Sequence, residues 1–189
     1  MNYCRHKLYF ALCDFFRTSK TQLFVTLGVW LAGLILAVVF FGDNDVITVI
    51  NAGRALWKMI VVVLPCYIMI AVATFSKYLM PLVYAAFLYL GYSAGRWACI
   101  LFSTSVFCFF TIYVVIYLPI YVADFLLMNF LVSELSPYYS YAPKCRTASN
   151  CFRSNVVILK TTVIVLAVNI AIIIIWVLIF CKLFGLASL

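Results

Sequence analysis

Residues 79–97, LMPLVYAAFLYLGYSAGRW, form the stretch that decides how this chain folds. The stretch is apolar enough to lie in lipid, begins near Pro81 and ends at Arg96, and it has an apolar segment on each side. Gly91 and Gly95 are four residues apart, so they share one face of a helix and let another backbone come close. The sequence therefore predicts a tightly packed helix in the middle of a transmembrane bundle.

The composition of the whole chain indicates a membrane protein. Its 189 residues are 68% hydrophobic and 10% charged, and the mean hydropathy is +1.20. A soluble domain is nearer half apolar and a quarter charged, so we expect one all-α, polytopic membrane domain over residues 1–189. The net charge of +8 comes from basic residues beside apolar segments. There they orient the chain and meet lipid headgroups, so no nucleic-acid partner is expected.

Apolar segments of suitable length predict about five membrane spans. The first contains nineteen residues without a charge, which at 1.5 Å per residue covers about 28 Å and matches the bilayer core. The second contains Pro65, which membrane bundles tolerate as a kink. The spans are residues 23–41, 59–75, 79–95, 97–122 and 161–181.

Two further segments are expected to lie outside the bilayer core. Residues 1–22 carry apolar residues at helical spacing and basic residues away from them, which predicts an amphipathic helix on the lipid surface. A disordered basic tail is the alternative. The basic residues expected to contact lipid headgroups are Arg5, Lys7, Arg17 and Lys20. Residues 124–160 form the only long polar segment. It is expected to begin as an apolar helix continuation, FLLMNFLVSEL, and to become a cytoplasmic loop rich in turn residues.

The distribution of Lys and Arg predicts the orientation. With the N-terminus inside, nine basic residues lie on the cytoplasmic side and four lie outside, and the reverse placement exchanges the two numbers. The positive-inside rule therefore favours a cytoplasmic N-terminus, an outside C-terminus and a cytoplasmic 124–160 loop. The expected location is the plasma membrane, that is, the bacterial inner membrane. Arg96 separates spans three and four with almost no loop, so one broken or re-entrant unit is the alternative there.

The residues that could carry chemistry are few. The chain has one histidine, His6, and no common nucleotide-binding or hydrolase motif. Cys145 and Cys151 are the only cysteines that resemble a pair, and their spacing is loose for zinc. The acids, none well inside an expected span, are Asp14, Asp43, Asp45, Asp124 and Glu134. We therefore expect no enzyme, no cofactor and no metal site.

The expected spans contain polar residues but no charge. Ion-coupled transport usually keeps ionisable residues inside spans, so their absence from the five segments argues against a proton- or sodium-coupled transporter. Asn169 interrupts the apolar run AVNIAIIIIWVLIF and is expected to form a hydrogen bond between helices. Together with Pro81, Gly91 and Gly95, it belongs to the predicted helix-packing residues, and the glycine groove is expected to seat the fifth span or a partner protein.

Two stretches resemble the stage II sporulation protein M family of bacterial membrane proteins. Residues 17–39, RTSKTQLFVTLGVWLAGLILAVV, are similar to the family's basic start and glycine-bearing first span. Residues 81–95, PLVYAAFLYLGYSAG, resemble its central region. The matching positions are Pro81, Leu82, Gly91, Tyr92 and Gly95. The resemblance implies a five-span, non-enzymatic membrane protein that acts with peptidoglycan-degrading enzymes during sporulation.

Two functions are therefore kept open. The first is a scaffold that assembles or localises cell-envelope remodelling proteins, with envelope hydrolases as partners. The second is the permease subunit of a transporter, which an ATPase subunit could drive. Beyond the lipid bilayer and these partners, a homo-oligomer is also left open by the sequence.

Overall fold

The computed structural model describes residues 20–40, 52–139 and 148–183, and over these ranges all regular structure is helical. The predicted all-α class is confirmed. The amphipathic helix expected over residues 1–22 lies, apart from its last three residues, outside the described ranges. The helices are α2 (Lys20–Val39), α3 (Ala52–Ala73), η1 (Lys77–Leu79), α4 (Pro81–Thr104), α5 (Val106–Cys108), η2 (Phe109–Tyr117), α6 (Leu118–Tyr139) and α7 (Ala148–Leu183).

Four of the described helical segments are long and apolar enough to cross a membrane. They are Lys20–Val39, Pro81–Thr104, Phe109–Ser136 and Asn155–Ile179. The apolar part of α3, Trp57–Ala73, is shorter than these four. It contains Pro65 and corresponds to the second span expected from the sequence. The structure thus contains four span-length helices and one shorter apolar helix.

The boundary between the third and fourth spans differs from the one expected at Arg96. Arg96 lies inside α4 with an exposed side chain, so it interrupts neither the helix nor its backbone hydrogen bonds. The chain instead turns at Ser105, whose φ of −169° and ψ of 138° are extended. The Ser105 hydroxyl accepts a hydrogen bond from the amide of Phe107 at 3.2 Å. A long basic side chain can reach the interface from within a helix, whereas an extended residue ends it.

This shift changes the fourth span and the loop that follows it. The apolar helix runs over Phe109–Ser136 rather than 97–122. The helical continuation expected at the start of 124–160 is present, since α6 continues to Tyr139. The expected loop after it is shorter than predicted, because α7 already begins at Ala148. Asp124 suggested the start of a polar loop, but it is an internal residue of α6.

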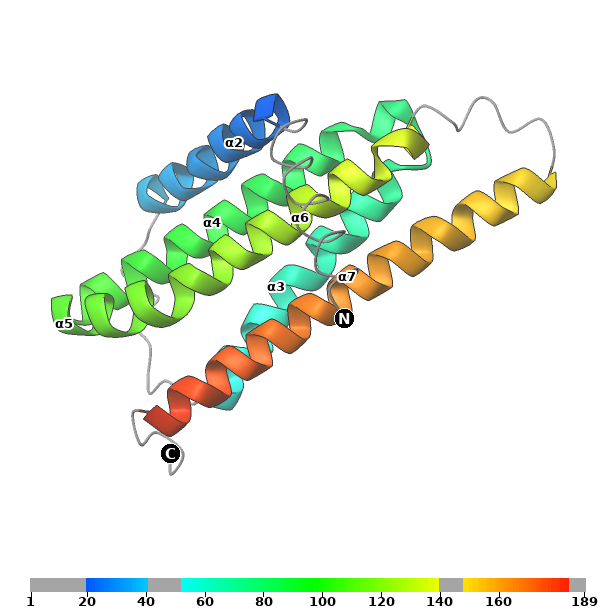
Figure 1. Ribbon diagram of the computed structural model, residues 1–189. Helices are drawn as coiled ribbons and strands as arrows, with labels where there is room; N and C mark the ends of the chain where they lie inside the picture. Colours follow the sequence, from blue (N-terminus) through cyan, green and yellow to red (C-terminus); the bar gives the residue numbers. More distant parts are fainter. Residues whose placement is uncertain (1–19, 41–51, 140–147, 184–189) are drawn as a thin grey trace.

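Helix α4 lies at the centre of the bundle. It packs against α2, α3 and α6, while α7 packs against α3 and α6 (Figure 1). Phe87 of α4 is fully buried, and its ring meets the ring of Phe125 of α6 edge-on at 5.5 Å. Trp30 of α2 approaches the same Phe125 ring at 6.1 Å. The core therefore joins α2, α4 and α6 through aromatic contacts.

The seam between α2 and α4 is formed by glycines of both helices. A Cβ atom on Gly91 would collide with the carbonyl oxygen of Trp30, and one on Gly33 would collide with the carbonyl oxygen of Leu88. A Cβ on Gly95 would lie 2.8 Å from the Cβ of Ala37. The two backbones are thus closer than any side chain at Gly91 or Gly33 would permit.

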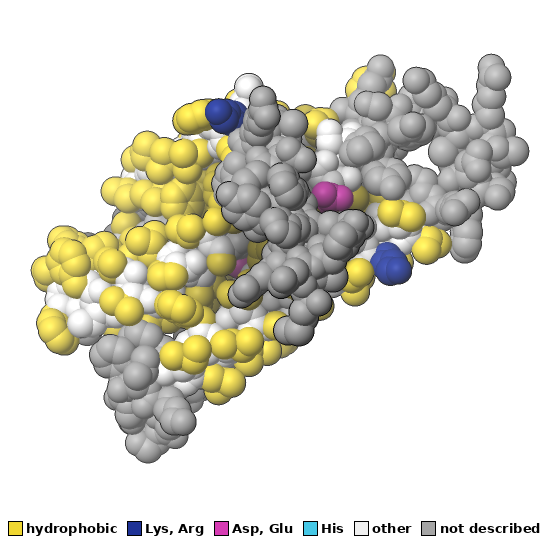
Figure 2. All heavy atoms as spheres, viewed as in Figure 1, with side chains coloured by type: hydrophobic (Ala, Val, Ile, Leu, Met, Phe, Trp, Pro, Cys, Tyr) yellow, Lys and Arg dark blue, Asp and Glu magenta, His cyan; other side chains and the backbone are white. Residues whose placement is uncertain are grey.

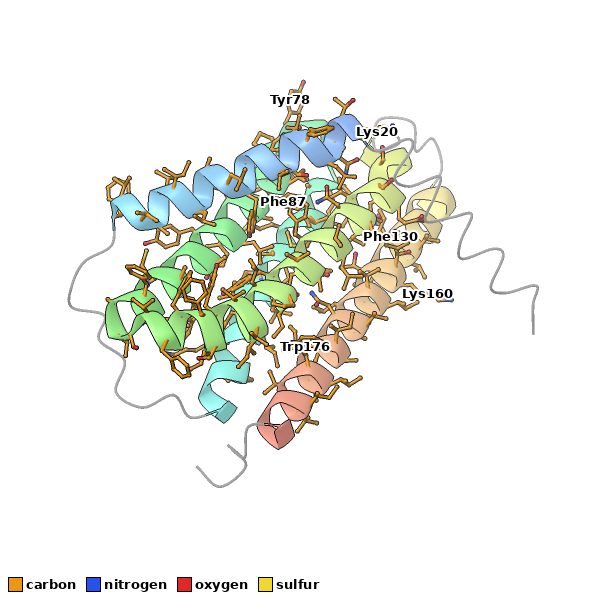
Figure 3. The ribbon with its side chains drawn as sticks, turned by 60° about the vertical axis from the view of Figure 1, so that its left-hand side comes forward. Lys20, Tyr78, Phe87, Phe130, Lys160 and Trp176 are labelled. Atoms are coloured by element: carbon orange, nitrogen blue, oxygen red, sulfur yellow. The ribbon has the colours of Figure 1, made fainter. Side chains whose placement is uncertain are left out.

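The outer surface is predominantly apolar. Large aliphatic and aromatic side chains are exposed along α2 and α7, including Phe24, Ile35 and Leu159. Figure 2 shows this apolar surface with only isolated basic and acidic groups on the visible face. Lys20 and Lys160 lie toward the end of the bundle where α2 and α7 begin (Figure 3). Such a surface is suited to lipid.

Candidate functional site

Asp124 is the one buried acidic side chain of the described residues. It lies near the middle of the Phe109–Ser136 segment and is 1% exposed. The expectation that no charged residue lies within a span is therefore wrong, because the span is displaced along the chain. An ionisable residue inside a membrane bundle is costly, and proteins retain such residues mainly for function.

Asp124 belongs to a polar cluster built from three helices. Asn169 of α7 is fully buried and donates a hydrogen bond from Nδ2 to the hydroxyl of Tyr67 of α3 at 3.0 Å. The Asn169 side chain also lies close to the Asp124 carboxyl group. The side chain of Cys66 of α3 is fully buried near them. The cluster thus connects α3, α6 and α7 inside the bundle.

Two oxygen atoms of this cluster lack a hydrogen-bond partner. They are Oδ1 of Asp124 and Oδ1 of Asn169, both fully shielded from solvent. A buried acceptor without a donor carries the full cost of losing water, and an isolated buried carboxylate costs more. A proton on Asp124 would supply a hydrogen-bond donor, and a small cation would instead coordinate these oxygens and balance the carboxylate charge. The cluster is therefore equipped to take up a positive charge.

A second polar contact joins α2 to α6. The Thr26 hydroxyl lies 2.8 Å from Oδ1 of Asn129 and donates to it, and both side chains are buried. Asn129 in turn donates from Nδ2 to the carbonyl oxygen of Phe125, one turn earlier in its own helix. Its side-chain amide is thus satisfied in both donor and acceptor roles. This contact is structural, because it leaves no polar atom over for a ligand.

Replacing Thr26 by Val should destabilise the protein by about 0.6–2 kcal/mol, the range for hydrogen bonds between membrane helices. Valine keeps the shape of threonine but leaves Asn129 Oδ1 without a donor. The measurement is thermal unfolding in detergent. Thr111→Val is the matched control, because the Thr111 hydroxyl donates to the carbonyl of Phe107, four residues earlier in the chain, and not to a distant helix. Equal unfolding temperatures for the two variants would contradict the assignment.

A row of buried tyrosines leads away from Asp124 along one face of η2 and α6. Tyr121, Tyr117 and Tyr113 precede Asp124 at spacings of three, four and four residues, and each is at most 5% exposed. The Tyr121 hydroxyl lies 3.0 Å from the hydroxyl of Ser93 of α4. The Tyr117 hydroxyl is buried without a hydrogen-bond partner.

The packing residues proposed from the sequence lie in different parts of the bundle. Gly91 and Gly95 face α2, not the fifth span or another protein. Pro81 is the first residue of α4, where its missing N–H is tolerated. Asn169 contacts α3 and α6 instead of the glycine groove. Packing and polar contacts thus occupy separate seams.

Of the proposed lipid-surface residues, only Lys20 is described. It is the first residue of α2 and is exposed. Arg5, Lys7 and Arg17 lie outside the described ranges, as does Cys145. In the ranges that are described, no three His, Cys, Asp or Glu side chains gather where they could hold a metal ion.

Sequence reasoning missed Asp124 and Tyr67 as site residues. Asp124 could have been found from its spacing to the three tyrosines that precede it, which places all four residues on one helix face. Tyr67 had no comparable signal, because its role depends on where α7 places Asn169. No protein-family model, no curated protein and no solved structure matches this chain.

Proposed function

We propose that this protein is a non-enzymatic permease that conducts protons across the plasma membrane, with Asp124 as the group that binds and releases the proton. The observation that carries the proposal is the carboxyl group of Asp124, buried near the middle of a span-length helix with Oδ1 unpartnered. Proton pathways through membrane proteins use buried acids of this kind.

The chemistry of the cluster favours a proton over a metal cation. A desolvated metal cation needs several oxygen ligands in place of its hydration shell. The cluster offers the Asp124 carboxylate, the Asn169 amide oxygen and the Tyr67 hydroxyl, which already accepts a hydrogen bond from Asn169. A proton needs one acceptor, and a protonated Asp124 could donate to a neighbouring oxygen such as Oδ1 of Asn169.

The scaffold function has less support. Its main sequence feature was the groove at Gly91 and Gly95, which could have docked a helix of a partner protein. Helix α2 of the same chain fills that groove. A scaffold role like that of the stage II sporulation protein M family remains a separate proposal. Co-purification of envelope hydrolases with this protein would support it.

Proton conduction can be tested with the purified full-length protein in liposomes that enclose a pH-sensitive dye. A potassium gradient and valinomycin set the membrane potential, inside negative. We expect the interior to acidify faster than in protein-free liposomes, without sodium or nucleotide present. The absence of nucleotide distinguishes this activity from an ATP-driven permease subunit. Acidification at the protein-free rate would overturn the proposal.

A further inference from the structure

The tyrosine row connects the buried carboxyl group to one end of the bundle. Asp124, Tyr121, Tyr117 and Tyr113 lie on one face, and residue 113 is eleven positions before Asp124, which is at most about 16 Å at the α-helical rise of 1.5 Å per residue. The row therefore covers roughly half of a bilayer core. It leads toward Ser105, where α4 ends and the chain turns back into η2.

Aromatic stacking holds this row in place. The Tyr117 ring stacks on Trp97 of α4 at 5.1 Å, and Tyr113 stacks between Tyr117 at 6.5 Å and Phe109 at 5.2 Å. The row begins in η2, which has π-helical hydrogen bonding. π-Helical turns are uncommon and frequently occur at functional sites. Stacking thus fixes the rings, while the hydroxyl groups remain available for other partners.

The end of the row is polar. The ammonium group of Lys58, an exposed residue of α3, lies 5.3 Å from the centre of the Trp97 ring. Trp97 is the residue on which Tyr117 stacks. An exposed cation beside the row indicates that this end reaches the aqueous interface. By the charge count of the sequence, Lys58 lies on the outside of the membrane.

The hydroxyl groups of Tyr121 and Tyr117 are both buried but differ in their hydrogen bonding. Tyr121 already exchanges a hydrogen bond with Ser93. The Tyr117 hydroxyl is unpartnered although the side chain is only 2% exposed. A buried hydroxyl without a partner is unexpected in a purely structural aromatic stack, and it is the observation that points to a passing ligand.

We propose that Tyr113, Tyr117, Tyr121 and Ser93 form the route by which protons reach Asp124 from the Lys58 end of the bundle. This inference rests on the proposed proton conduction. A hydroxyl group, with water where a gap remains, gives its proton to the next acceptor toward Asp124 and receives another from behind. Each hydroxyl returns to its original protonation state, and the net result is one proton moved to the carboxylate. The role of the tyrosines is to position and relay this proton.

The test is the rate at which the Asp124 carboxyl proton exchanges with D₂O, followed by its infrared C=O band in full-length protein in liposomes. The band is assigned as the one missing from Asp124→Asn. Tyr117→Phe keeps the stacked ring but removes the hydroxyl group. It should slow exchange about tenfold, which is the rate change expected when one hydrogen bond is lost from the transfer step. Tyr121→Phe should slow it similarly. Tyr89→Phe, at a partly exposed tyrosine of α4, is the control and should exchange at the wild-type rate.

The outcomes separate the route from the proposed function. If both Tyr117→Phe and Tyr121→Phe exchange at the wild-type rate, the route is wrong, even if the liposomes conduct protons. If wild type and Asp124→Asn give the same carboxyl band, Asp124 holds no proton and the route is also overturned. If both variants slow exchange but the wild-type protein conducts no protons, the route is supported and the proposed permease function is wrong.

Discussion

Gly91→Leu should strongly destabilise the protein by overfilling the seam between α2 and α4. The Cβ atom alone would meet the Trp30 carbonyl oxygen, which belongs to a helix backbone and cannot rotate away. Overfilling a packed contact costs about 1–3 kcal/mol, and for a chain of this size each kcal/mol lowers Tm by about 2–4 °C. The measurement is thermal unfolding in detergent, with insertion into membranes checked separately because leucine favours lipid.

Alanine provides the sharper comparison at the same position. In an ordinary helix, replacing glycine by alanine stabilises by about 0.5–1 kcal/mol. Gly91→Ala should instead lower Tm. Gly28→Ala is the matched control on α2, because a Cβ atom there has nothing within 4 Å, so Tm should stay the same or rise. If Gly91→Ala behaved like Gly28→Ala, the two backbones would not be in the contact described.

Asp124→Asn should reduce proton conduction to the level of protein-free liposomes. Asparagine has nearly the same shape as aspartate and can stay close to Asn169, but it cannot take up and release a proton in the same way. The protein should nevertheless fold, since the substitution removes a buried charge whose desolvation is unfavourable. We therefore expect conduction to be lost with Tm unchanged or raised, measured on the same preparation.

Glu134→Gln is the control for this experiment. Glu134 is an acid of the same helix but is exposed, so conduction should match that of the wild type. Conduction by Asp124→Asn at the wild-type rate would show that protons pass by another route. Loss of conduction together with a large fall in Tm would assign Asp124 a structural role instead.

The helical class and most apolar segments could be predicted because length and hydropathy act locally. Residues 81–95 of the expected third span lie in α4, and residues 161–181 lie in α7. The glycines of the central stretch indicated close packing, but not the partner, because α2 and α4 are joined only by the tertiary fold. Gly33 of α2 contributes to this packing as much as Gly91 of α4, since each lies against the backbone of the other helix.

The buried polar site was harder to predict from the sequence than the helices. A charge normally ends an apolar span, so Arg96 and Asp124 were both placed at boundaries. In the structure Arg96 is exposed on α4, whereas Asp124 is covered by α3 and α7. Two charged residues that the sequence placed at span boundaries therefore differ in exposure. Only the packing of neighbouring helices determines which of them is buried.

The contact between Thr26 and Asn129 has a consequence for biosynthesis. During translation, α2 leaves the ribosome long before α6, so it must wait in the bilayer without this partner. The Thr26 hydroxyl lies within 2.9 Å of the Gln22 carbonyl and 3.1 Å of the Leu23 carbonyl of its own helix. Asn129 likewise has a local acceptor at Phe125. Each helix can therefore be inserted with these donors already bonded. On docking of α2 onto α6, the Thr26 hydroxyl can change from a local acceptor to Asn129 Oδ1, while the Asn129–Phe125 bond is kept.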